Sequence, residues 1–370
     1  SADGKGTTYN AGDVTDKLNT QTLYAICSAN TYTIEYKANG GNGTMNSTNA
    51  TFDQVVTISK NTFTKEGYTF AGWTTKNDGT DDKYGWTNWS GTWKYVNGQY
   101  GILSNKLVLY AMWTPNTNTA YKVVHQQMNL DGSTYTTVET ENLTGTTDSS
   151  VSPTVKNYTG FTAPSVQTVT ISANGSTVVT YKYTRNKYIF TLGSATGITT
   201  TGSTASGSYY YGSTITLKAS ANTGYTFNGW ISSNTSLVAN QANASAIFKM
   251  PVGNITMTPN VTVNPLIFNS QSKTIIYNST SNQTVSITPA TGGSESYKSY
   301  SYSIVFGNAD GYFSINGTTI TVKAGTPANT YTLKVLATDT NTKATKEATI
   351  TITIGRKSVT KPKSPAEKIY

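Results

Sequence analysis

The sequence predicts an all-β chain built from several small modules in series. Only 12% of its 370 residues are charged and 26 are tyrosines, whereas disordered chains combine high net charge with few aromatic residues. Thr, Tyr, Val and Ile favour the pleated surface of strands, and the many Asn and Gly residues favour turns. No stretch of about 12 residues has the apolar spacing of an amphipathic helix. Together these features favour short strands joined by turns.

An internal repeat predicts the serial arrangement. The peptide Gly67–Trp73 (GYTFAGW) returns as Gly224–Trp230 (GYTFNGW), with six of seven residues identical. Repeats of this kind are typical of stacked small units, each with its own core, and not of one large catalytic domain. We therefore expect an elongated, monomeric chain whose linkers near 115–120, 184–188 and 263–266 are short.

Residues 1–29 are expected to be the C-terminal half of one unit. Their last apolar segment, Thr22–Cys27, parallels Leu107–Trp113, and Ala2–Gly4 parallels Asn77–Gly79. Because this half-unit lacks leading strands of its own, it either pairs with the next unit or frays. Because the chain starts within a unit, we expect it to be a piece of a longer protein.

Residues 30–116 are expected to be the complete copy of that unit. Alternating side chains and turn residues predict strands at Tyr32–Tyr36, Gly67–Trp73 and Leu107–Met112, and a turn at Asn39–Gly43. The segment Thr51–Ser59 fits either one short helix or a third strand, and the pattern does not decide between them.

Three further units are expected before a tail or linker at 357–370. The second, 117–185, is bounded by strands Tyr121–His125 and Val178–Tyr183, and the third, 186–263, carries the second copy of the repeated peptide. The fourth, 264–356, has regularly spaced strands typical of a β-sandwich. These strands are predicted at Thr284–Ile287, Tyr300–Val305, Thr319–Val322, Tyr331–Ala337 and Ala348–Ile354.

The composition argues against several classes of function. The net charge is +9, but only two of the basic residues are arginines and the lysines are dispersed, whereas nucleic-acid sites concentrate positive charge on one patch. No apolar run has the ~18 residues of a membrane helix. The single histidine, His125, and single cysteine, Cys27, cannot supply a structural zinc site, a disulfide or a nucleophile–base pair in separate modules. We expect His125 to be a packed or surface residue.

Two segments are candidate binding sites. Asp78, Asp81 and Asp82 lie close together in a turn that contains glycine, and such oxygen ligands suit calcium. The alternative is an ordinary acidic turn. The second segment is an insertion of about a dozen residues relative to the half-unit, and its aromatic side chains could stack on sugars or anchor a partner. The alternative is that they enlarge a small core. The candidate ligand-binding residues are Trp86, Trp89, Trp93 and Tyr95.

No catalytic residue or cofactor is predicted. The candidate glutamates Glu35, Glu66, Glu139, Glu141 and Glu295 are spread over several modules, whereas glycoside hydrolysis needs two carboxylates in one cleft. The sequence therefore favours a chain that is not an enzyme.

The segment Tyr32–Trp113 resembles the Listeria–Bacteroides repeat, the B-repeat of internalin-type surface proteins. The resemblance rests on Tyr36–Gly41, Phe63–Trp73 and Leu109–Trp113, and Cys27 stands where the family has tryptophan in the preceding half-copy. Residues 186–263 are similar to a divergent form of the same repeat. The resemblance implies small β-grasp-like folds and a cell-surface role.

Two other units resemble different families. Residues 121–184 resemble a mucin-binding-protein-type module through Tyr121–His125, Asn129–Gly132, Leu143–Thr146 and Val178–Tyr181. This implies another β-grasp-like unit and adhesion to a host glycoprotein. The fourth unit is similar to bacterial immunoglobulin- or cadherin-like modules through Gly311–Ile315 and Gly325–Tyr331.

These resemblances predict a non-enzymatic stalk or adhesion segment of an exported bacterial protein, located outside the cell on its surface or wall. Such a segment would space or present a functional part elsewhere. The alternatives are modules that bind mucin or another host glycan, and accessory modules of a larger secreted enzyme. No nucleic-acid partner and no membrane insertion are expected within this segment.

Overall fold

The computed structural model describes residues 3–13, 22–51, 55–80, 92–94, 106–294 and 300–356. All regular secondary structure in these ranges is β-strand, which confirms the prediction of an all-β chain. Within the same ranges no helix has the length and apolarity needed to cross a membrane.

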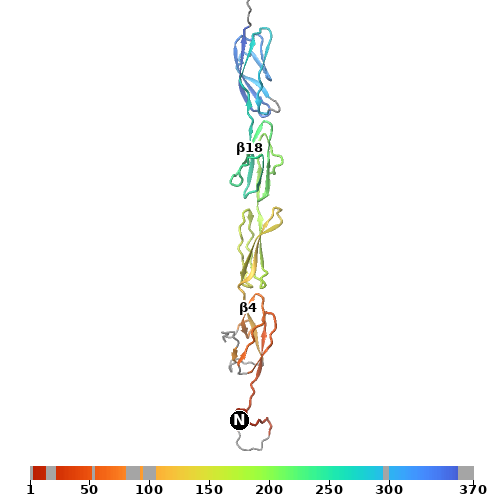
Figure 1. Ribbon diagram of the computed structural model, residues 1–370, viewed down its shortest axis with the longest axis vertical. Coiled ribbons are helices and arrows are strands. Elements are labelled where there is room, and N and C mark those ends of the chain that lie inside the picture. Colours follow the sequence, from red (N-terminus) through yellow and green to blue (C-terminus); the bar gives the residue numbers. More distant parts are fainter. Residues whose placement is uncertain are drawn as a thin grey trace, which may run out of the picture. The chain divides into compact units, whose positions relative to one another are not determined.

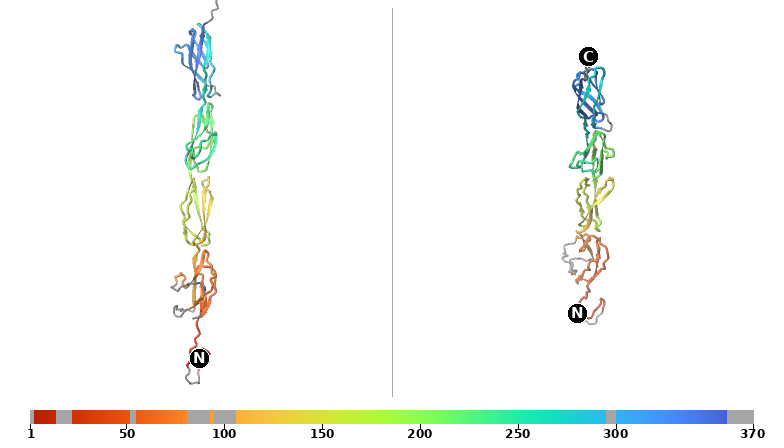
Figure 2. Two further views of the ribbon diagram at one scale, coloured as in Figure 1. Left: turned by 60° about the vertical axis from the view of Figure 1, so that its left-hand side comes forward. Right: turned by 45° about the horizontal axis from the view of Figure 1, so that its top comes forward.

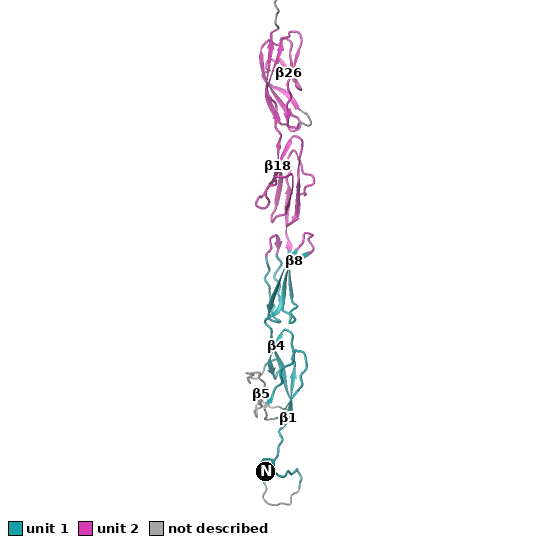
Figure 3. Cartoon of the chain, viewed as in Figure 1, with its two compact units in different colours: residues 1–127, 135–156, 163–183 teal, residues 128–134, 157–162, 184–370 magenta. Residues whose placement is uncertain are grey.

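Every strand pairing in the described residues stays within one of four consecutive segments, which we call strand groups 1 to 4 (Figure 1; two further views are given in Figure 2). Their strands span residues 31–115, 119–185, 187–263 and 266–355. By its contacts the chain forms two compact units, and Figure 3 colours them separately. Unit 1 holds residues 1–127, 135–156 and 163–183, and unit 2 holds 128–134, 157–162 and 184–370. This division is coarser than the predicted modules, so the module boundaries stay a prediction.

Group 1 contains a mixed four-stranded sheet in the order β2-β1-β6-β4. The first strand, β1, pairs in parallel with the last, β6, and the other neighbours are antiparallel. Val55–Thr57 forms β3 and pairs with β5, so the strand alternative for Thr51–Ser59 is correct there. The strands are β1 (Thr31–Lys37), β2 (Thr48–Thr51), β3 (Val55–Thr57), β4 (Tyr68–Thr74), β5 (Thr92–Lys94) and β6 (Lys106–Pro115).

Residues 22–30 form no strand. Part of residues 1–29 lies outside the described residues, so the expectation that this segment is a half-unit, which either pairs with the next unit or frays, stays a prediction.

Group 2 repeats the parallel pairing of first and last strands in a sheet of order β10-β12-β7-β8. Its buried side chains come chiefly from the two central strands and include Tyr121, Val123, Val179 and Tyr181. The strands are β7 (Thr119–Met128), β8 (Tyr135–Gly145), β9 (Ser150–Val151), β10 (Phe161–Thr162), β11 (Val169–Thr170) and β12 (Val178–Arg185).

Group 3 has the same plan as group 1, with the sheet order β15-β13-β20-β18. In both groups the repeated GYTF-x-GW peptide forms an outer strand with a register shift after its phenylalanine. The tryptophan that follows is buried, with 3% of Trp73 and 1% of Trp230 exposed, so this part of the repeat builds the core. The strands are β13 (Lys187–Leu192), β14 (Ile198–Thr199), β15 (Gly207–Tyr210), β16 (Thr214–Lys218), β17 (Ser220–Ala221), β18 (Tyr225–Ser232), β19 (Ser245–Lys249) and β20 (Ile255–Val263).

Group 4 is a sandwich of a four-stranded sheet, β22-β29-β28-β25, and a three-stranded sheet, β23-β27-β26. Alternate side chains of the two sheets share one apolar core, for example Val285 and Ile320 with Leu333 and Ile350. All five predicted strands are present. The strands are β21 (Leu266–Ile267), β22 (Gln271–Ile276), β23 (Gln283–Ser286), β24 (Thr291–Gly292), β25 (Tyr300–Phe306), β26 (Phe313–Asn316), β27 (Thr319–Val322), β28 (Thr330–Asp339) and β29 (Thr345–Gly355).

Candidate functional site

Most of the predicted binding residues lie outside the described residues. These are Trp86, Trp89, Tyr95, Asp81 and Asp82. Trp93 lies in β5, where it is paired with Val56. The calcium and sugar hypotheses therefore stay predictions.

Asp78 is described, and it organises its own turn. Its carboxylate accepts hydrogen bonds from the backbone N–H (2.9 Å) and the hydroxyl (2.7 Å) of Thr80. These bonds lower the pKa of the Asp78 carboxyl because they favour its ionised form. This is the geometry of an Asp-stabilised turn.

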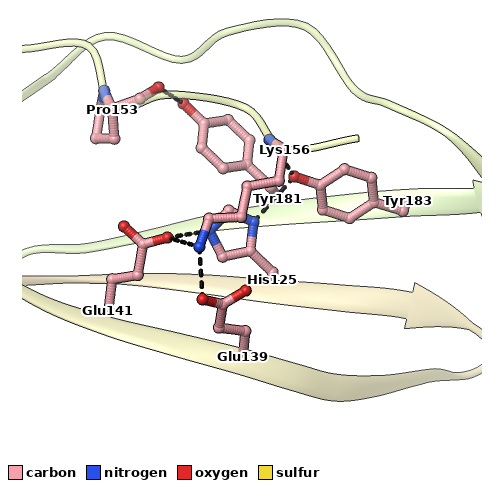
Figure 4. Close-up of polar contacts among 7 residues, drawn as sticks. All are labelled: His125, Glu139, Glu141, Pro153, Lys156, Tyr181 and Tyr183. Carbon is pink, nitrogen blue, oxygen red and sulfur yellow. Dashed lines mark hydrogen bonds and ion pairs between the residues drawn. The ribbon is translucent and has the colours of Figure 1, made fainter. Parts of the chain in front are cut away.

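The main polar cluster in unit 1 surrounds His125 (Figure 4). The imidazole is fully buried on β7, with Tyr181 and Tyr183 of β12 beside it, each with its ring centroid 5.8 Å from that of His125. Its Nδ1 lies 2.9 Å from the Tyr183 hydroxyl, and its Nε2 lies 3.2 Å from Oε1 of Glu141 on β8. The side chain therefore links three neighbouring strands, as a packed residue.

Lys156 closes this cluster at the surface. Its ammonium bonds to Glu139 at 2.5 Å and also contacts Glu141, while its backbone N–H donates to the Tyr183 hydroxyl at 2.9 Å. The hydrogen bonds that the Lys156 ammonium donates to Glu139 and Glu141 raise the pKa of this amine, and burial raises the pKa of the Tyr183 phenol. A charged, hydrogen-bonded lysine is a poor nucleophile. The cluster consequently acts as a structural tie between β7, β8 and β12.

A second polar arrangement ends each of groups 1, 2 and 3. In group 1, Asn116 follows the last strand and donates its backbone N–H to the Gly67 carbonyl at 2.9 Å, while the Thr69 hydroxyl donates to the Asn116 side-chain oxygen at 2.6 Å. We call this arrangement the Gly–Thr–Asn clasp. The other two are Gly160, Thr162 and Asn186, and Gly224, Thr226 and Asn264, with distances of 2.9 and 2.6 Å and of 2.8 and 2.6 Å.

The clasp glycine has a second role, because the following group packs on it. Gly67 has φ of +74°, which favours glycine. A Cβ atom there would lie 2.7 Å from the Ala173 carbonyl oxygen in group 2. Within unit 2, a Cβ on Gly224 would lie 2.5 Å from the Thr342 methyl carbon of group 4. Glycine is therefore required both for the turn and for close approach of the next group.

Hydrogen bonds join the clasps of groups 1 and 2 to the next group in the chain. The buried Thr147 of group 2 donates its N–H to the Asn116 carbonyl (2.9 Å) and its hydroxyl to the Gly67 carbonyl (2.8 Å). In unit 2, the Tyr211 N–H makes the equivalent bond to the Asn186 carbonyl at 2.8 Å. The clasp thus holds the end of one group and the start of the next.

Sequence reasoning found the glycine and threonine of the repeat but not this role. The clasp asparagine lies far from the glycine along the chain, and group 2 carries Gly160-Phe161-Thr162 in place of the GYTF peptide. A usable signal was the recurring Thr-x-Asn that ends the last strand, at Thr114–Asn116, Thr184–Asn186 and Thr262–Asn264.

An open groove of about 790 Å³ lies beside the joint of groups 3 and 4 in unit 2. Enclosed, largely apolar pockets are typical of small-molecule sites, and this groove is instead lined by small and polar side chains that also form the joint. The lining residues are Thr196, Gly197, Ala221, Asn222, Thr223, Tyr225, Thr340 and Asn341.

The fold and these clusters define a class: a chain whose described residues form small all-β sheet groups that follow one another in the sequence, with short connections between them. Residues 32–111 match the Listeria-Bacteroides repeat domain, and residues 191–265 match the divergent InlB B-repeat domain. These matches confirm both repeat resemblances, and such repeats are typical of bacterial surface proteins.

One curated relative is a "Putative membrane protein" of Evansella cellulosilytica. It is 32% identical over 98 residues, which cover 26% of this chain and 13% of that protein. The aligned segment is therefore a small part of that relative.

Among solved structures, the similar chains include extracellular domains of cadherins. One is protocadherin gamma B7 domains 1–4, with 9% identity, TM-score 0.22, and coverage of 68% of this chain and 54% of that chain. Another is Drosophila N-cadherin EC1-3, with 11% identity, TM-score 0.21, and coverage of 88% and 98%. At these TM-scores the likeness carries no argument about fold or function.

Proposed function

We propose that this chain is a non-enzymatic stalk segment of an exported bacterial cell-surface protein, which spaces or presents a functional part located elsewhere. Each strand group would serve as one β module, of β-grasp-like type in groups 1 to 3 and immunoglobulin- or cadherin-like type in group 4. Group 2 would be of the mucin-binding-protein type.

The recurring Gly–Thr–Asn clasp carries this proposal. The same three-residue arrangement ends three successive groups, although the groups that follow differ in sequence and topology. Few residues separate the last strand of one group from the first strand of the next, as between Pro115 and Thr119 or Val263 and Leu266. The same arrangement occurs once more within group 3, between Gly197, Thr199 and Asn222, but its recurrence at three successive group ends supports a connecting role.

Two measurements on the bacterium that produces the protein test the stalk. Antibodies against residues 186–263 should label intact cells, and labelling only after lysis would refute surface exposure. In a strain with an epitope tag before residue 30, deletion of residues 117–263 should bring the tag closer to the cell surface. A matched strain carrying Gly79→Ala controls for expression, and an unchanged tag height in the deletion strain would refute spacing.

The tryptophan-rich insertion favours a second candidate, a module that binds mucin or another host glycan. Trp89→Ala should then abolish binding of the full chain to immobilised mucin, and Trp73→Phe, a conservative change in the buried core, is the matched control. The absence of binding by the unmodified chain would remove this candidate and leave the stalk proposal intact.

A further inference from the structure

The first and last long strands of every group are parallel neighbours. The pairs are β1 with β6, β7 with β12, β13 with β20 and β22 with β29. In a parallel pair both strands run the same way, so the chain enters a group at one end of the pair and leaves at the other. Tension applied through the chain would therefore pull the two strands past each other.

This geometry decides how the interstrand hydrogen bonds fail. Bonds between sliding strands share the load and must yield together, whereas bonds between strands pulled apart from one end yield one at a time. The bonds of a parallel pair are evenly spaced along it, so a longer pair shares the load among more bonds. Resistance to tension should therefore follow the length of the parallel pair.

The four pairs differ in length. In group 2 the register runs over Lys122–Gln127 and Val178–Tyr183, and in group 4 over Gln271–Ile276 and Ile350–Gly355. In group 3 it covers only Phe190–Leu192 and Ile255–Met257, with two further bonds, from the Gly193 N–H to the Met257 carbonyl and from the Ile189 N–H to the Asn254 side-chain oxygen. Group 1 is intermediate, with Thr33–Lys37 against Lys106–Tyr110.

Side chains reinforce the pair in group 2. His125 of β7 is directly opposite Tyr181 of β12 in the register. Its ring forms a hydrogen bond with the hydroxyl of Tyr183, two residues further along β12. Its other nitrogen faces Glu141 of β8, which is held by Lys156. The His125 cluster thus links the two sliding strands to each other and to a third strand.

We propose that each group is a tension-bearing unit whose parallel terminal strands form the mechanical clamp. Group 3 is the weakest of the four, and the His125 cluster strengthens group 2. This inference rests on the proposed stalk function, since only a chain held at both ends experiences such tension.

The test is single-molecule force spectroscopy on the full chain, held by tags at its two ends. The groups contain between about 67 and about 90 residues, so the gains in extended length on unfolding differ by up to about 80 Å at ~3.5 Å per residue. The event with the length of group 3 should come at the lowest force. Unfolding of group 3 at a force equal to or above that of groups 1, 2 and 4 would overturn the proposal.

A change of pulling direction separates the effect of the clamp geometry from that of thermodynamic stability, because the folded group is the same in both experiments. Asn118 and Ser176 are both exposed, and they precede the two parallel strands β7 and β12 at the same end. In a Cys27→Ser background, handles on Asn118→Cys and Ser176→Cys would peel these strands apart. Group 2 should then unfold at a several-fold lower force than under end-to-end tension, and equal forces would refute the clamp.

The variant His125→Phe tests the cluster. It keeps an aromatic ring but removes the hydrogen bond to Tyr183 and the contact with Glu141, and Tyr183 and Glu141 retain Lys156 as a partner. The unfolding force of group 2 should fall while the other three groups in the same molecule stay unchanged. An unchanged force for group 2 would refute the role of the cluster. None of these outcomes bears on tag height at the cell surface, so the clamp proposal and the stalk proposal can be refuted independently.

Discussion

The Gly–Thr–Asn clasp makes a sharp prediction, because group 1 contains a matched pair of glycines. Gly67 and Gly79 have nearly the same backbone angle, φ of +74° and +75°. An added Cβ at position 67 would lie 2.7 Å from the Ala173 carbonyl oxygen and 2.8 Å from its Cα, whereas at position 79 nothing lies within 4 Å. Gly67→Ala and Gly79→Ala therefore share the backbone strain and differ in the contact with group 2.

The size of the difference follows from these distances. A non-glycine residue with this left-handed backbone costs about 1–2 kcal/mol at either position. Overpacking adds about 1–3 kcal/mol at position 67 only, because Ala173 contributes mainly backbone atoms that cannot swing aside. The joint can relieve this clash by releasing the two Thr147 hydrogen bonds to Asn116 and Gly67. We therefore expect the joint to open more easily in Gly67→Ala.

Amide hydrogen exchange on the full chain measures this opening. A loss of about 1–3 kcal/mol in local stability speeds exchange of the Thr147 amide by about 5- to 150-fold relative to Gly79→Ala. Amides in the centre of β1 and β6 should exchange alike in both variants. Equal exchange at Thr147 in the two variants would show that group 2 does not pack on Gly67, and the clasp would lose its role as a joint.

Three further predictions concern buried or paired side chains. His125→Phe should lower the free energy of unfolding of group 2 by about 1–2 kcal/mol, or its Tm by about 4–15 °C, by calorimetry; an unchanged Tm would mean that its bonds contribute nothing. Burial opposes ionisation of Asp339, but hydrogen bonds from the Ser294 hydroxyl and from the backbone N–H groups of Ser294, Asn341 and Thr342 outweigh it and hold the carboxyl pKa at about 2, against 3.8. The ionised Asp339 therefore contributes about 2 kcal/mol to the free energy of unfolding above pH 3.8, and this contribution is lost as the pH falls through 2. Urea denaturation of Asp339→Asn should lack this acid dependence. A dependence that persists in the variant would contradict the assignment to Asp339. Glu139 and Glu141 raise the pKa of Lys156, so the stabilisation from the charged amine is fully present below pH 10.5 and is lost as the pH rises above it. In urea denaturation at alkaline pH, Lys156→Gln should therefore lose less stability with rising pH than the unmodified chain.

Local pattern was sufficient for the strands but not for the polar clusters. Alternation in Tyr331–Ala337 and Ala348–Ile354 predicted two strands of the group 4 sandwich, because burial of every second side chain is encoded along each strand itself. The surroundings of His125 depend on three distant segments: Tyr183 lies 58 residues away, and Glu141 and Lys156 arrive from β8 and a loop. No periodicity within β7 indicates these partners, so the sequence predicted only that His125 is a packed or surface residue and not which side chains it contacts.

The two copies of GYTF-x-GW show how one short peptide serves two purposes. Its tryptophan points into the core, where the Trp73 ring lies 4.9 Å from that of Tyr36, and where Trp230 is 1% exposed. Its glycine and threonine point to the end of the group, where they bind the clasp asparagine and accept the next group. Group 2 has the glycine and threonine of the clasp, in Gly160-Phe161-Thr162, without the tryptophan, and it still forms the clasp. The joint is therefore separable from the core that accompanies it. That separability explains how groups of different topology succeed one another in a single chain through the same junction.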